Sequence, residues 1–545
     1  MANGEVMMVR GNVVDIRQQS IFAAEVEIRE GRIAAIRPVE EAPSTFLMPG
    51  FIDSHIHIES SMLTPGEFAR AAVVHGTVAT VSDPHEIANV LGEAGVRFML
   101  NAAKGVPFKF HFGVPSCVPA TNFETAGARL DADAVARLLD DPQLGYLSEM
   151  MNYPGVLAGD REVIAKIDAA RQRGKPVDGH APGLRGEMAE KYVAAGITTD
   201  HECTTRDEAL EKLAAGCKIQ IREGSAARNF DALYTLIDDY PDNCMFCSDD
   251  KHPDELSVGH IDVLVRTAIE RGMDTMKVLR VACLNPVEHY SLNVGTLQVG
   301  DPADLIEVDD LKTFRIRRTW IAGQLVAENG KATFDVADVA PMNEFRASPK
   351  SPDDFRVPAQ STRVRVIVAE DGELITGQTS VDAKVEAGFA AADPERDILK
   401  IAVVNRYEDT PPAVAFIKNV GLKQGAIASS VAHDCHNVVA VGVDDESLCR
   451  AVNLVIDNKG GLSVAGPNVG QCLPLPIAGL MSPDSCRAVG DAYHRLNEIV
   501  ASFGSPLRAP FMTLSFMALL VIPSLKLSDR GLFDGEKFEF VSLFE

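Results

Sequence analysis

The sequence predicts an α/β protein whose centre is a (β/α)8 barrel. Between about residues 51 and 286, short apolar runs such as 76–81, 197–199 and 217–221 alternate with segments of helical periodicity. Repeated β-α units over about 240 residues fit a closed barrel of parallel strands. A doubly wound open sheet is the alternative, but no G-x-G-x-x-G sequence follows the first strand to support it.

The helical segments of this region are recognised by the spacing of their apolar residues. The last of them follows Thr204 and Thr205, whose hydroxyl groups suit an N-cap. We expect helices over residues 134–139, 161–171, 187–195 and 206–215.

Strand patterns flank the barrel on both sides. Residues 26–28 and 32–36 lie on either side of a Glu30-Gly31 turn, and a similar pattern returns at 300–306 and 320–326. Two separated β segments around one long middle region predict a single small β domain built from both ends. We place this domain at residues 1–48 plus 290–345, with the barrel at 49–289 inserted into it.

A further domain is expected after residue 345. The chain passes through a linker rich in Pro and Ser at 348–352 and then becomes strand-rich, with apolar runs at 398–404 and 438–443. These features predict a C-terminal α+β domain over residues 346–545.

Composition excludes some classes of function. The chain of 545 residues carries a net charge of -25, which disfavours nucleic-acid and anionic-membrane partners because both reward a basic surface. The apolar run 511–522 is shorter than a bilayer span, and we expect a buried core segment there. The ten cysteines are scattered and the chain starts without a basic and apolar leader, so we expect a cytoplasmic protein without a disulfide framework.

Two histidines mark the first strand of the predicted barrel. The stretch Pro49-Gly50-Phe51-Ile52-Asp53-Ser54-His55-Ile56-His57 contains a turn, a short apolar run and an H-x-H pair. Residues i and i+2 of a strand point to the same face, so His55 and His57 would present their imidazoles to one ion. A pair of partly buried histidines at a strand end is the alternative.

The ends of the later strands supply more candidates. Functional side chains of a (β/α)8 barrel sit at the carboxyl ends of its strands. In order along the chain, the fourth to sixth and the eighth strand ends contribute Glu149, His180, His201 and Asp249. The seventh contributes Glu223.

This donor set suits borderline divalent metals. Four imidazoles with Glu149 and Asp249 are enough to hold two ions of Mn, Fe, Zn or Co, with one carboxylate bridging. Metal ions that share a water lower its pKa and provide a nucleophile without a serine or cysteine.

The ordered set resembles the amidohydrolase superfamily, whose members pair a metal-dependent hydrolase barrel with a small β domain formed by both flanks. The resemblance covers about residues 5–340 and implies that the metal ligands are His55, His57, Glu149, His180, His201 and Asp249. Hydantoinase-like and urease-like members bridge with a carboxylated lysine, whereas this chain has Glu149. Mononuclear deaminases carry H-x-x-E after strand five, whereas His180 is followed by Ala-Pro-Gly.

Three further runs look like the adenine deaminase family of bacteria and archaea. They are Ser82-Asp83-Pro84-His85-Glu86-Ile87-Ala88-Asn89-Val90, Leu147-Ser148-Glu149-Met150-Met151-Asn152 and His433-Asp434-Cys435-His436-Asn437. This resemblance implies hydrolytic deamination of adenine to hypoxanthine and ammonia, with two divalent ions, Mn being the first choice and Fe or Zn the alternatives. It also implies self-association into a homo-oligomer.

From this resemblance we predict roles for the remaining candidates. Asp249 accepts the proton of the attacking water, and Glu223 contacts the purine edge or, alternatively, pairs with a basic residue. His85 and Glu86 line the pocket or bind an additional metal, or Glu86 serves only a helix start after Pro84. His433, Asp434 and His436 cover the barrel mouth or add ligands, or they form a polar turn.

Two other functions are compatible with the same barrel. The metal-activated water also serves hydrolysis of a cyclic amide or an N-acyl bond, and the pocket residues decide between these substrates and a purine. A barrel that has lost its ligands and serves assembly is the third interpretation, and the filled ligand positions argue against it.

Overall fold

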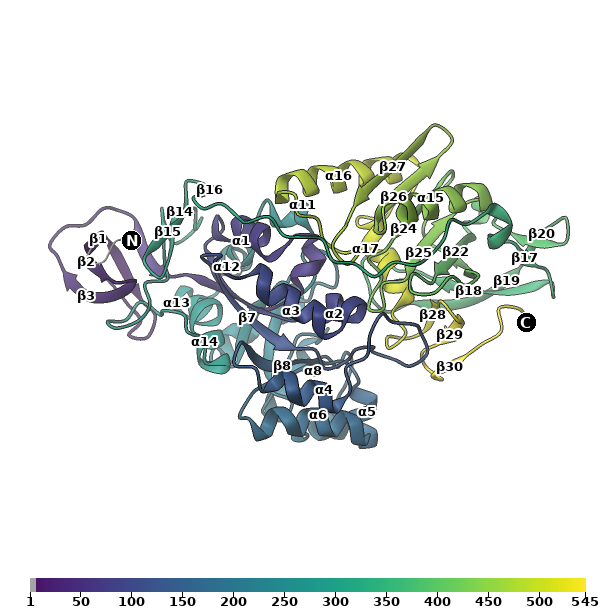
Figure 1. The fold of residues 1–545 in the computed structure, drawn as a ribbon. Coiled ribbons are helices and arrows are strands. Elements are labelled where there is room, and N and C mark those ends of the chain that lie inside the picture. Colours follow the sequence, from purple (N-terminus) through teal and green to yellow (C-terminus); the bar gives the residue numbers. More distant parts are fainter. Residues whose placement is uncertain (1–5) are drawn as a thin grey trace.

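The computed structural model describes residues 6–545, so the first five residues of the predicted small β domain lie outside the described residues. Figure 1 shows three parts in a row: a small β sheet, a barrel of strands wrapped by helices, and an α/β part at the C-terminal end. The predicted fold class, a barrel with a small β domain and a C-terminal α+β domain, is confirmed. The domain boundaries near residues 49, 290 and 346 stay predictions.

The small sheet draws its strands from both flanks of the barrel. Its order is β16-β15-β14-β13-β4-β1-β2-β3, so the N-terminal strands and those that follow the barrel meet where β4 pairs with β13. Because β4 ends only one residue before the first barrel strand, this sheet anchors the barrel at its entrance. The strands are β1 (Val6–Asp15), β2 (Ser20–Arg29), β3 (Arg32–Pro38), β4 (Phe46–Pro49), β13 (Leu305–Val308), β14 (Ile316–Ile321), β15 (Gln324–Glu328) and β16 (Lys331–Ala332).

Eight parallel strands form the barrel. They are β5 (Phe51–Ile56), β6 (Thr77–Ser82), β7 (Lys109–Val114), β8 (Leu144–Met150), β9 (Val177–Gly179), β10 (Thr199–Asp200), β11 (Lys218–Arg222) and β12 (Cys244–Cys247). The sets β5–β9 and β10–β12 are each continuously paired. Backbone hydrogen bonds close the ring, from Thr198 N to Val177 O at 2.8 Å and from Asp249 N to His55 O at 2.9 Å.

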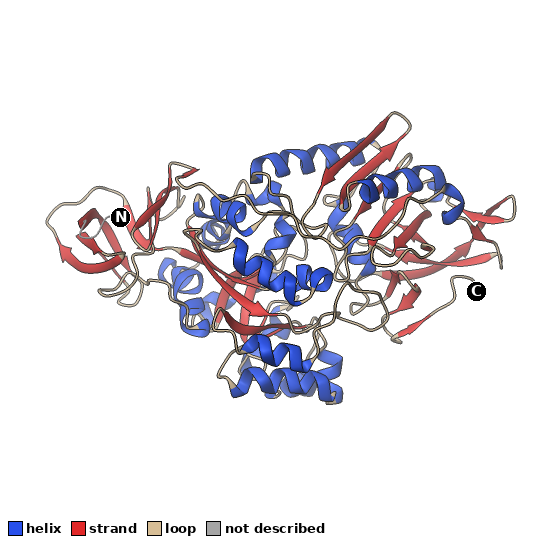
Figure 2. Cartoon of the chain, in the orientation of Figure 1, coloured by secondary structure: helices blue, strands red, loops and turns tan. Residues whose placement is uncertain are grey.

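Helices surround the barrel strands (Figure 2). All four helices expected from the sequence are present, and the Thr205 side chain accepts from Glu208 N as the predicted N-cap. The helices are α1 (Pro65–Val73), α2 (His85–Leu91), α3 (Glu93–Ala102), α4 (Ala132–Leu139), α5 (Tyr153–Ala158), α6 (Arg161–Gln172), α7 (Gly186–Ala194), α8 (Arg206–Ala214), α9 (Phe230–Leu233), α10 (Leu236–Asp239), α11 (Pro253–Leu256), α12 (Ile261–Glu270), α13 (Thr275–Leu279) and α14 (Asn285–Tyr290).

The C-terminal part is built on a second large sheet, whose order is β19-β18-β23-β22-β25-β24-β26-β27. Its strands are β18 (Arg363–Val368), β19 (Gly377–Asp382), β22 (Leu399–Val404), β23 (Ala413–Lys418), β24 (Ala426–Ser429), β25 (Val438–Gly442), β26 (Gly461–Gly466) and β27 (Val469–Pro474). Around it lie α15 (Asp445–Asp457), α16 (Cys486–Ser502), α17 (Pro510–Ser515) and the small strands β17 (Val357–Pro358), β20 (Lys384–Glu386), β21 (Phe389–Ala391), β28 (Leu525–Ser528), β29 (Gly531–Asp534) and β30 (Glu539–Phe540).

The C-terminal part packs against the end of the barrel where the strands exit. Ser482 N donates to Met62 O at 2.8 Å, and Ala227 N, after β11, donates to Gly372 O at 3.0 Å. The apolar run 511–522 includes α17 and is almost wholly buried, as the sequence predicts. Across residues 6–545, none of the helices has the length and apolar character needed to cross a membrane.

Gly50 joins the small sheet to the barrel and leaves no space for a side chain. A Cβ at this position would lie 2.2 Å from Cγ1 of Val78 on the neighbouring strand β6. We expect Gly50→Ala to lower the free energy of unfolding by about 1–3 kcal/mol, because the buried strand must shift to relieve the overlap. Urea denaturation measures the change. Gly470→Ala is the control, since its Cβ would meet nothing closer than 3.7 Å, and equal stability of the two variants would contradict the interpretation.

Candidate metal centre and active site

The six residues predicted as ligands converge at the carboxyl ends of the barrel strands. His55 lies on β5 and His57 directly follows it, and their ring centroids are 4.9 Å apart. The β-strand alternation therefore places both imidazoles on one face, as the sequence predicts. The others are Glu149 on β8, His180 after β9, His201 after β10 and Asp249 after β12, and all six side chains are buried.

Glu149 stands between two groups of side chains. Its Oε1 lies 3.3 Å from His57 Nε2, whereas its Oε2 lies 2.7 Å from His180 Nδ1 and 3.1 Å from His201 Nε2. Each carboxylate oxygen thus faces a different set of imidazoles. The cluster divides into two halves that share Glu149.

Asp249 completes the first half. Its Oδ1 lies 3.4 Å from His55 Nε2 and 3.1 Å from His57 Nε2. Its Oδ2 accepts a hydrogen bond of 2.7 Å from Arg222 Nη1, and Arg222 also pairs with Glu202. Arg222 therefore fixes one oxygen of Asp249 and leaves the other directed at the histidines.

Both central carboxylates are ionised. Burial alone would raise the pKa of Glu149, but His180 and the hydrogen bonds from His180, His201 and His57 hold it well below its usual range. Burial acts in the same way on Asp249, and there the Arg222 guanidinium is the largest opposing influence and lowers the pKa strongly. Two anionic carboxylates among imidazoles are the charge that divalent cations require.

Unpartnered nitrogen atoms show that these residues fit a metal. Within residues 6–545, both ring nitrogens of His55 and of His201, and Nε2 of His180, are buried without a hydrogen-bond partner. Buried polar atoms are nearly always paired, so such a group of imidazole nitrogens calls for a ligand. In His57, Nδ1 lies 3.2 Å from the Asp83 carbonyl oxygen and donates its proton there. This contact fixes the tautomer in which Nε2 carries no proton and can bind a metal.

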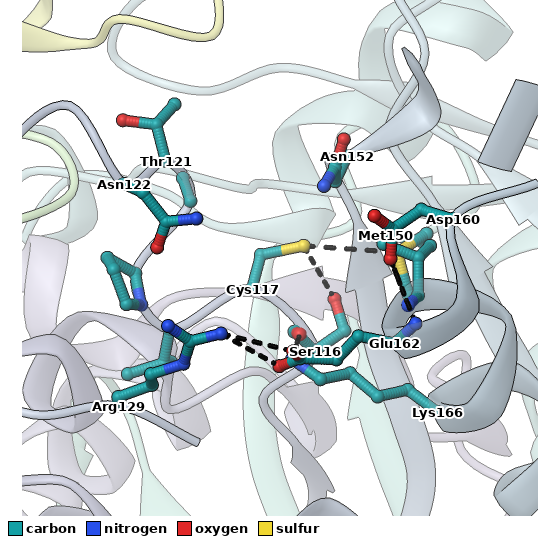
Figure 3. A pocket seen from close by; sticks show the side chains of 14 residues that line it. Ser116, Cys117, Thr121, Asn122, Arg129, Met150, Asn152, Asp160, Glu162 and Lys166 are labelled. Carbon is teal, nitrogen blue, oxygen red and sulfur yellow. Dashed lines mark hydrogen bonds and ion pairs between the residues drawn. The ribbon is translucent and has the colours of Figure 1, made fainter. Parts of the chain in front are cut away.

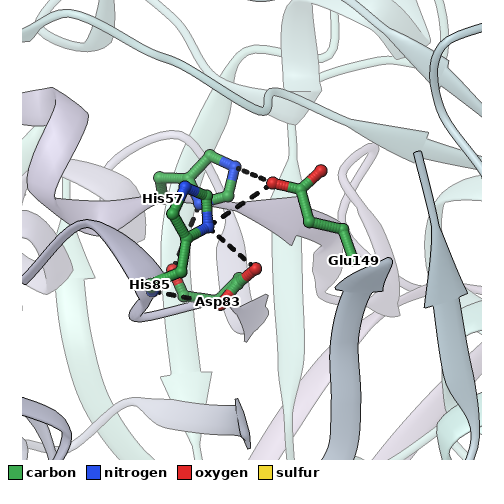
Figure 4. Close-up of side chains that lie close together, drawn as sticks. All are labelled: His57, Asp83, His85 and Glu149. Carbon is green, nitrogen blue, oxygen red and sulfur yellow. Dashed lines mark hydrogen bonds and ion pairs between the residues drawn. The ribbon is translucent and has the colours of Figure 1, made fainter. Parts of the chain in front are cut away.

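His85 and Asp83 form a second layer beside the first half (Figure 4). His85 begins α2 after β6, and its Nδ1 lies 3.0 Å from Asp83 Oδ2 and 3.4 Å from Glu149 Oε1. The His57 and His85 rings meet edge to face at 4.5 Å. The sequence singled out His85, but it missed Asp83, which the S-D-P-H-E run places two residues earlier.

The C-terminal part reaches into the same place. His433, Asp434 and His436 lie between β24 and β25, and all three are buried. His433 Nδ1 lies 2.5 Å from Glu86 Oε1, and His436 Nε2 contacts the other oxygen of Glu86. Asp434 Oδ1 is 3.8 Å from His85 Nε2. The structure therefore brings these five candidates together at the mouth of the barrel.

Glu223 does not join the cluster. Its carboxylate is partly exposed and lies 3.4 Å from Arg228, and burial raises its pKa. Side chains alternate along a strand, so Arg222 at the end of β11 points into the barrel mouth and Glu223 points away. Glu223 therefore pairs with a basic residue, Arg228, which is the alternative given for it above. The residues that do point inward here, Arg222 and Glu202, were not predicted from the sequence.

A small cavity lies over the cluster, between the barrel and the C-terminal part. Polar groups of the barrel form its floor, including His57, Glu149, His180 and Asp249, while Leu374, Phe516 and Leu519 of the C-terminal part form an apolar wall. A planar aromatic molecule with polar edges matches such a lining.

A second pocket, lined by residues 116–122 and by side chains of α6, has no histidine in its lining (Figure 3). Its charged groups are already paired: Arg129 lies 3.1 Å from Glu162, and Lys166 Nζ donates to Ser116 O at 2.8 Å. Its wall supports the centre, because Ser116 Oγ donates to the Glu149 carbonyl at 2.5 Å. Of these two sites, only the histidine cluster offers a set of side chains that could hold a metal ion.

The comparisons with known proteins agree with this geometry. The amidohydrolase family model matches residues 46–326, and the chain belongs to this family. A model of the adenine deaminase C-terminal domain matches residues 373–539.

Full-length relatives narrow the assignment. The chain is 58% identical to an adenine deaminase of Salinibacter ruber, over 98% of both chains, and 53% identical to an adenine deaminase of Methanosarcina mazei, over 98% of this chain and 99% of the relative. The chain is therefore a member of the adenine deaminase family. The family resemblance predicted from the sequence is confirmed, and these relatives do not favour the cyclic-amide alternative.

Substitution of single carboxylates tests which of them is needed to bind metal. We expect Glu149→Gln to lose most of its bound metal, because an amide cannot offer two anionic oxygens to both histidine sets. Glu223→Gln is the matched substitution and keeps its metal content, since its partner is Arg228. Elemental analysis of the two purified variants decides, and metal loss in Glu223→Gln would place that residue in the centre.

Proposed function

We propose that this chain hydrolyses adenine to hypoxanthine and ammonia at the cluster around Glu149. The observation that carries the proposal is the position of Glu149 between two sets of histidines, in a chain that matches adenine deaminases over nearly its full length. Adenine is small, planar and polar at its edges, which fits a cavity with a polar floor and an apolar wall.

Two divalent ions fit the two halves of the cluster. His55, His57 and Asp249 would hold one, His180 and His201 would hold the other, and Glu149 would serve both. When bound, such ions lower the pKa of water to near neutrality and so supply a nucleophile at physiological pH. Histidine and carboxylate ligands suit Mn, Fe and Zn, and Mn is our first choice.

Asp249 is the proposed proton acceptor. Water adds to C6 of adenine, and the proton it loses passes to Oδ1 of Asp249, the oxygen that Arg222 leaves free. The proton then goes to the departing amino group, the C6–N bond breaks, and ammonia leaves. The oxygen stays on C6 and its remaining proton moves to N1, so adenine and water give hypoxanthine and ammonia with all atoms accounted for.

We propose that Glu86, His433 and His436 at the barrel mouth bind the substrate and do not hold an additional metal. His436 Nδ1 accepts a hydrogen bond of 3.2 Å from Ala432 N, so a neutral His436 carries its proton on Nε2, which faces Glu86. In this tautomer the N–H of His436 faces Glu86 and favours the anionic carboxylate at this position. His433 contacts the other oxygen of Glu86, so the two histidines fix this carboxylate beside the cavity, where it can accept hydrogen bonds from the purine edge.

Substitution of Asp249 tests the proposed proton transfer. We expect Asp249→Asn to keep much of its metal, because the amide oxygen can still ligate, while kcat falls on the order of 10²–10⁴ through loss of the general base. Ammonia release from adenine measures kcat, and elemental analysis measures the metal. Turnover like that of the unmodified protein would rule out this role.

A double substitution tests the role of His433 and His436 at the barrel mouth. With alanine at both His433 and His436, Glu86 loses both contacts, and we expect kcat/KM for adenine to fall on the order of 10² while two equivalents of metal remain. Steady-state kinetics and metal analysis of the same preparation give both values. Unchanged activity with unchanged metal would remove these histidines from the function, and loss of one metal equivalent would favour the additional-metal alternative.

Self-association into a homo-oligomer and a cytoplasmic location remain predictions, and sedimentation of the purified protein measures the first.

A further inference from the structure

The C-terminal part holds a buried lysine that the reaction does not use. Lys526 lies on β28, and its side chain is fully buried. Within residues 6–545, no carboxylate lies within 4.0 Å of its Nζ, although most buried charged groups are paired. Burial without a counter-ion lowers the pKa of Lys526 to about 7.

Packing alone does not explain this residue. An amino group taken out of water costs free energy, and a methionine would fill similar space without that cost. We therefore expect the amino group to make hydrogen bonds that an apolar side chain cannot make.

Lys526 binds the backbone of two segments of the cavity wall. Its Nζ donates to Leu374 O at 2.5 Å and to Phe516 O at 3.0 Å. The side chains of Leu374 and Phe516 both line the cavity over the metal cluster. Phe516 in turn packs on His433, with ring centroids 5.3 Å apart. One amino group therefore holds two segments of the apolar wall of the cavity next to each other.

Leu374 also separates this cavity from the outside. It lines the inner cavity and, on its other side, an outer pocket that contains Ile375, whose side chain is 53% exposed. Glu202 lines both spaces as well.

The loop that carries Leu374 is fixed at its ends. Gly372 O accepts from Ala227 N at 3.0 Å, and Thr376 Oγ1 donates to Leu525 O at 2.9 Å. Between these anchors, in the part of the chain that the structure describes, the Leu374 carbonyl is held by Lys526.

We propose that Lys526 is a positioning residue for adenine: it holds Leu374 and Phe516 in place as the apolar ceiling of the purine pocket. This inference rests on the proposed function, since adenine is the molecule under the ceiling. It gives the C-terminal part a task in the reaction, which is to close the barrel mouth over the bound purine.

The test compares Lys526→Met with a second buried lysine. Lys400 lies in the same part of the chain and donates to Phe355 O at 3.0 Å and Asp445 Oδ1 at 2.6 Å, and neither partner lines the cavity. We expect Lys526→Met to raise KM for adenine roughly tenfold with kcat within about twofold, because the ceiling contacts the ground state and the transition state alike. Lys400→Met keeps the original KM even if it lowers stability.

Leu374→Ala provides a second approach that leaves the lysine intact. It should raise KM for adenine by a similar factor, and combining it with Lys526→Met should add little, since both act on the same wall. An unchanged KM in either folded single variant overturns the proposal, as does an equal rise in Lys400→Met. If Lys526→Met does not fold, Lys526→Gln takes its place in the comparison, because it removes the Nζ that donates to both carbonyl groups, and the same rise in KM is expected. Absence of adenine turnover in the unmodified protein would instead contradict the proposed function.

Discussion

The position of one carboxylate organises this molecule. Glu149 is fully enclosed, and each of its oxygens faces imidazoles that come from opposite sides of the barrel. This is possible only because eight parallel strands deliver their carboxyl ends to one small region, so that residues 55 and 201 come within stacking distance, with ring centroids 4.1 Å apart. The ring of strands, the helices outside it and the sheet that anchors its first strand all serve that convergence.

The candidate ligands could be predicted from the sequence because they follow a simple rule. A strand that ends in His or Asp can be recognised locally, and the barrel topology then brings the strand ends together without knowledge of any contact. At the seventh strand the same rule leaves a choice between two adjacent residues, because moving by one residue along a strand exchanges the inward and outward side chains. Arg222 and Glu223 are neighbours in sequence, yet only Arg222 reaches Asp249.

Contacts between distant parts of the chain had no local signal. Glu86 and His433 are separated by more than three hundred residues, and nothing in either run states that the two will touch. Lys526 is a plainer case, since a single lysine in a strand is ordinarily exposed, and only the packed structure shows it enclosed. Patterns of residues therefore gave the barrel and its candidate ligands, whereas the apolar ceiling over the site depends on tertiary packing.

The pairing of β4 with β13 has a consequence for how the chain acquires its structure. Pro49 and Leu305 are partners in this sheet, so about 250 residues must be made before the edge of β4 is covered. At translation rates of about 5–20 residues per second, the outer edge of β4 waits roughly 10–50 s for β13. During this interval the nascent chain has an open strand edge next to an unfinished barrel, and an edge of this kind can pair with another chain.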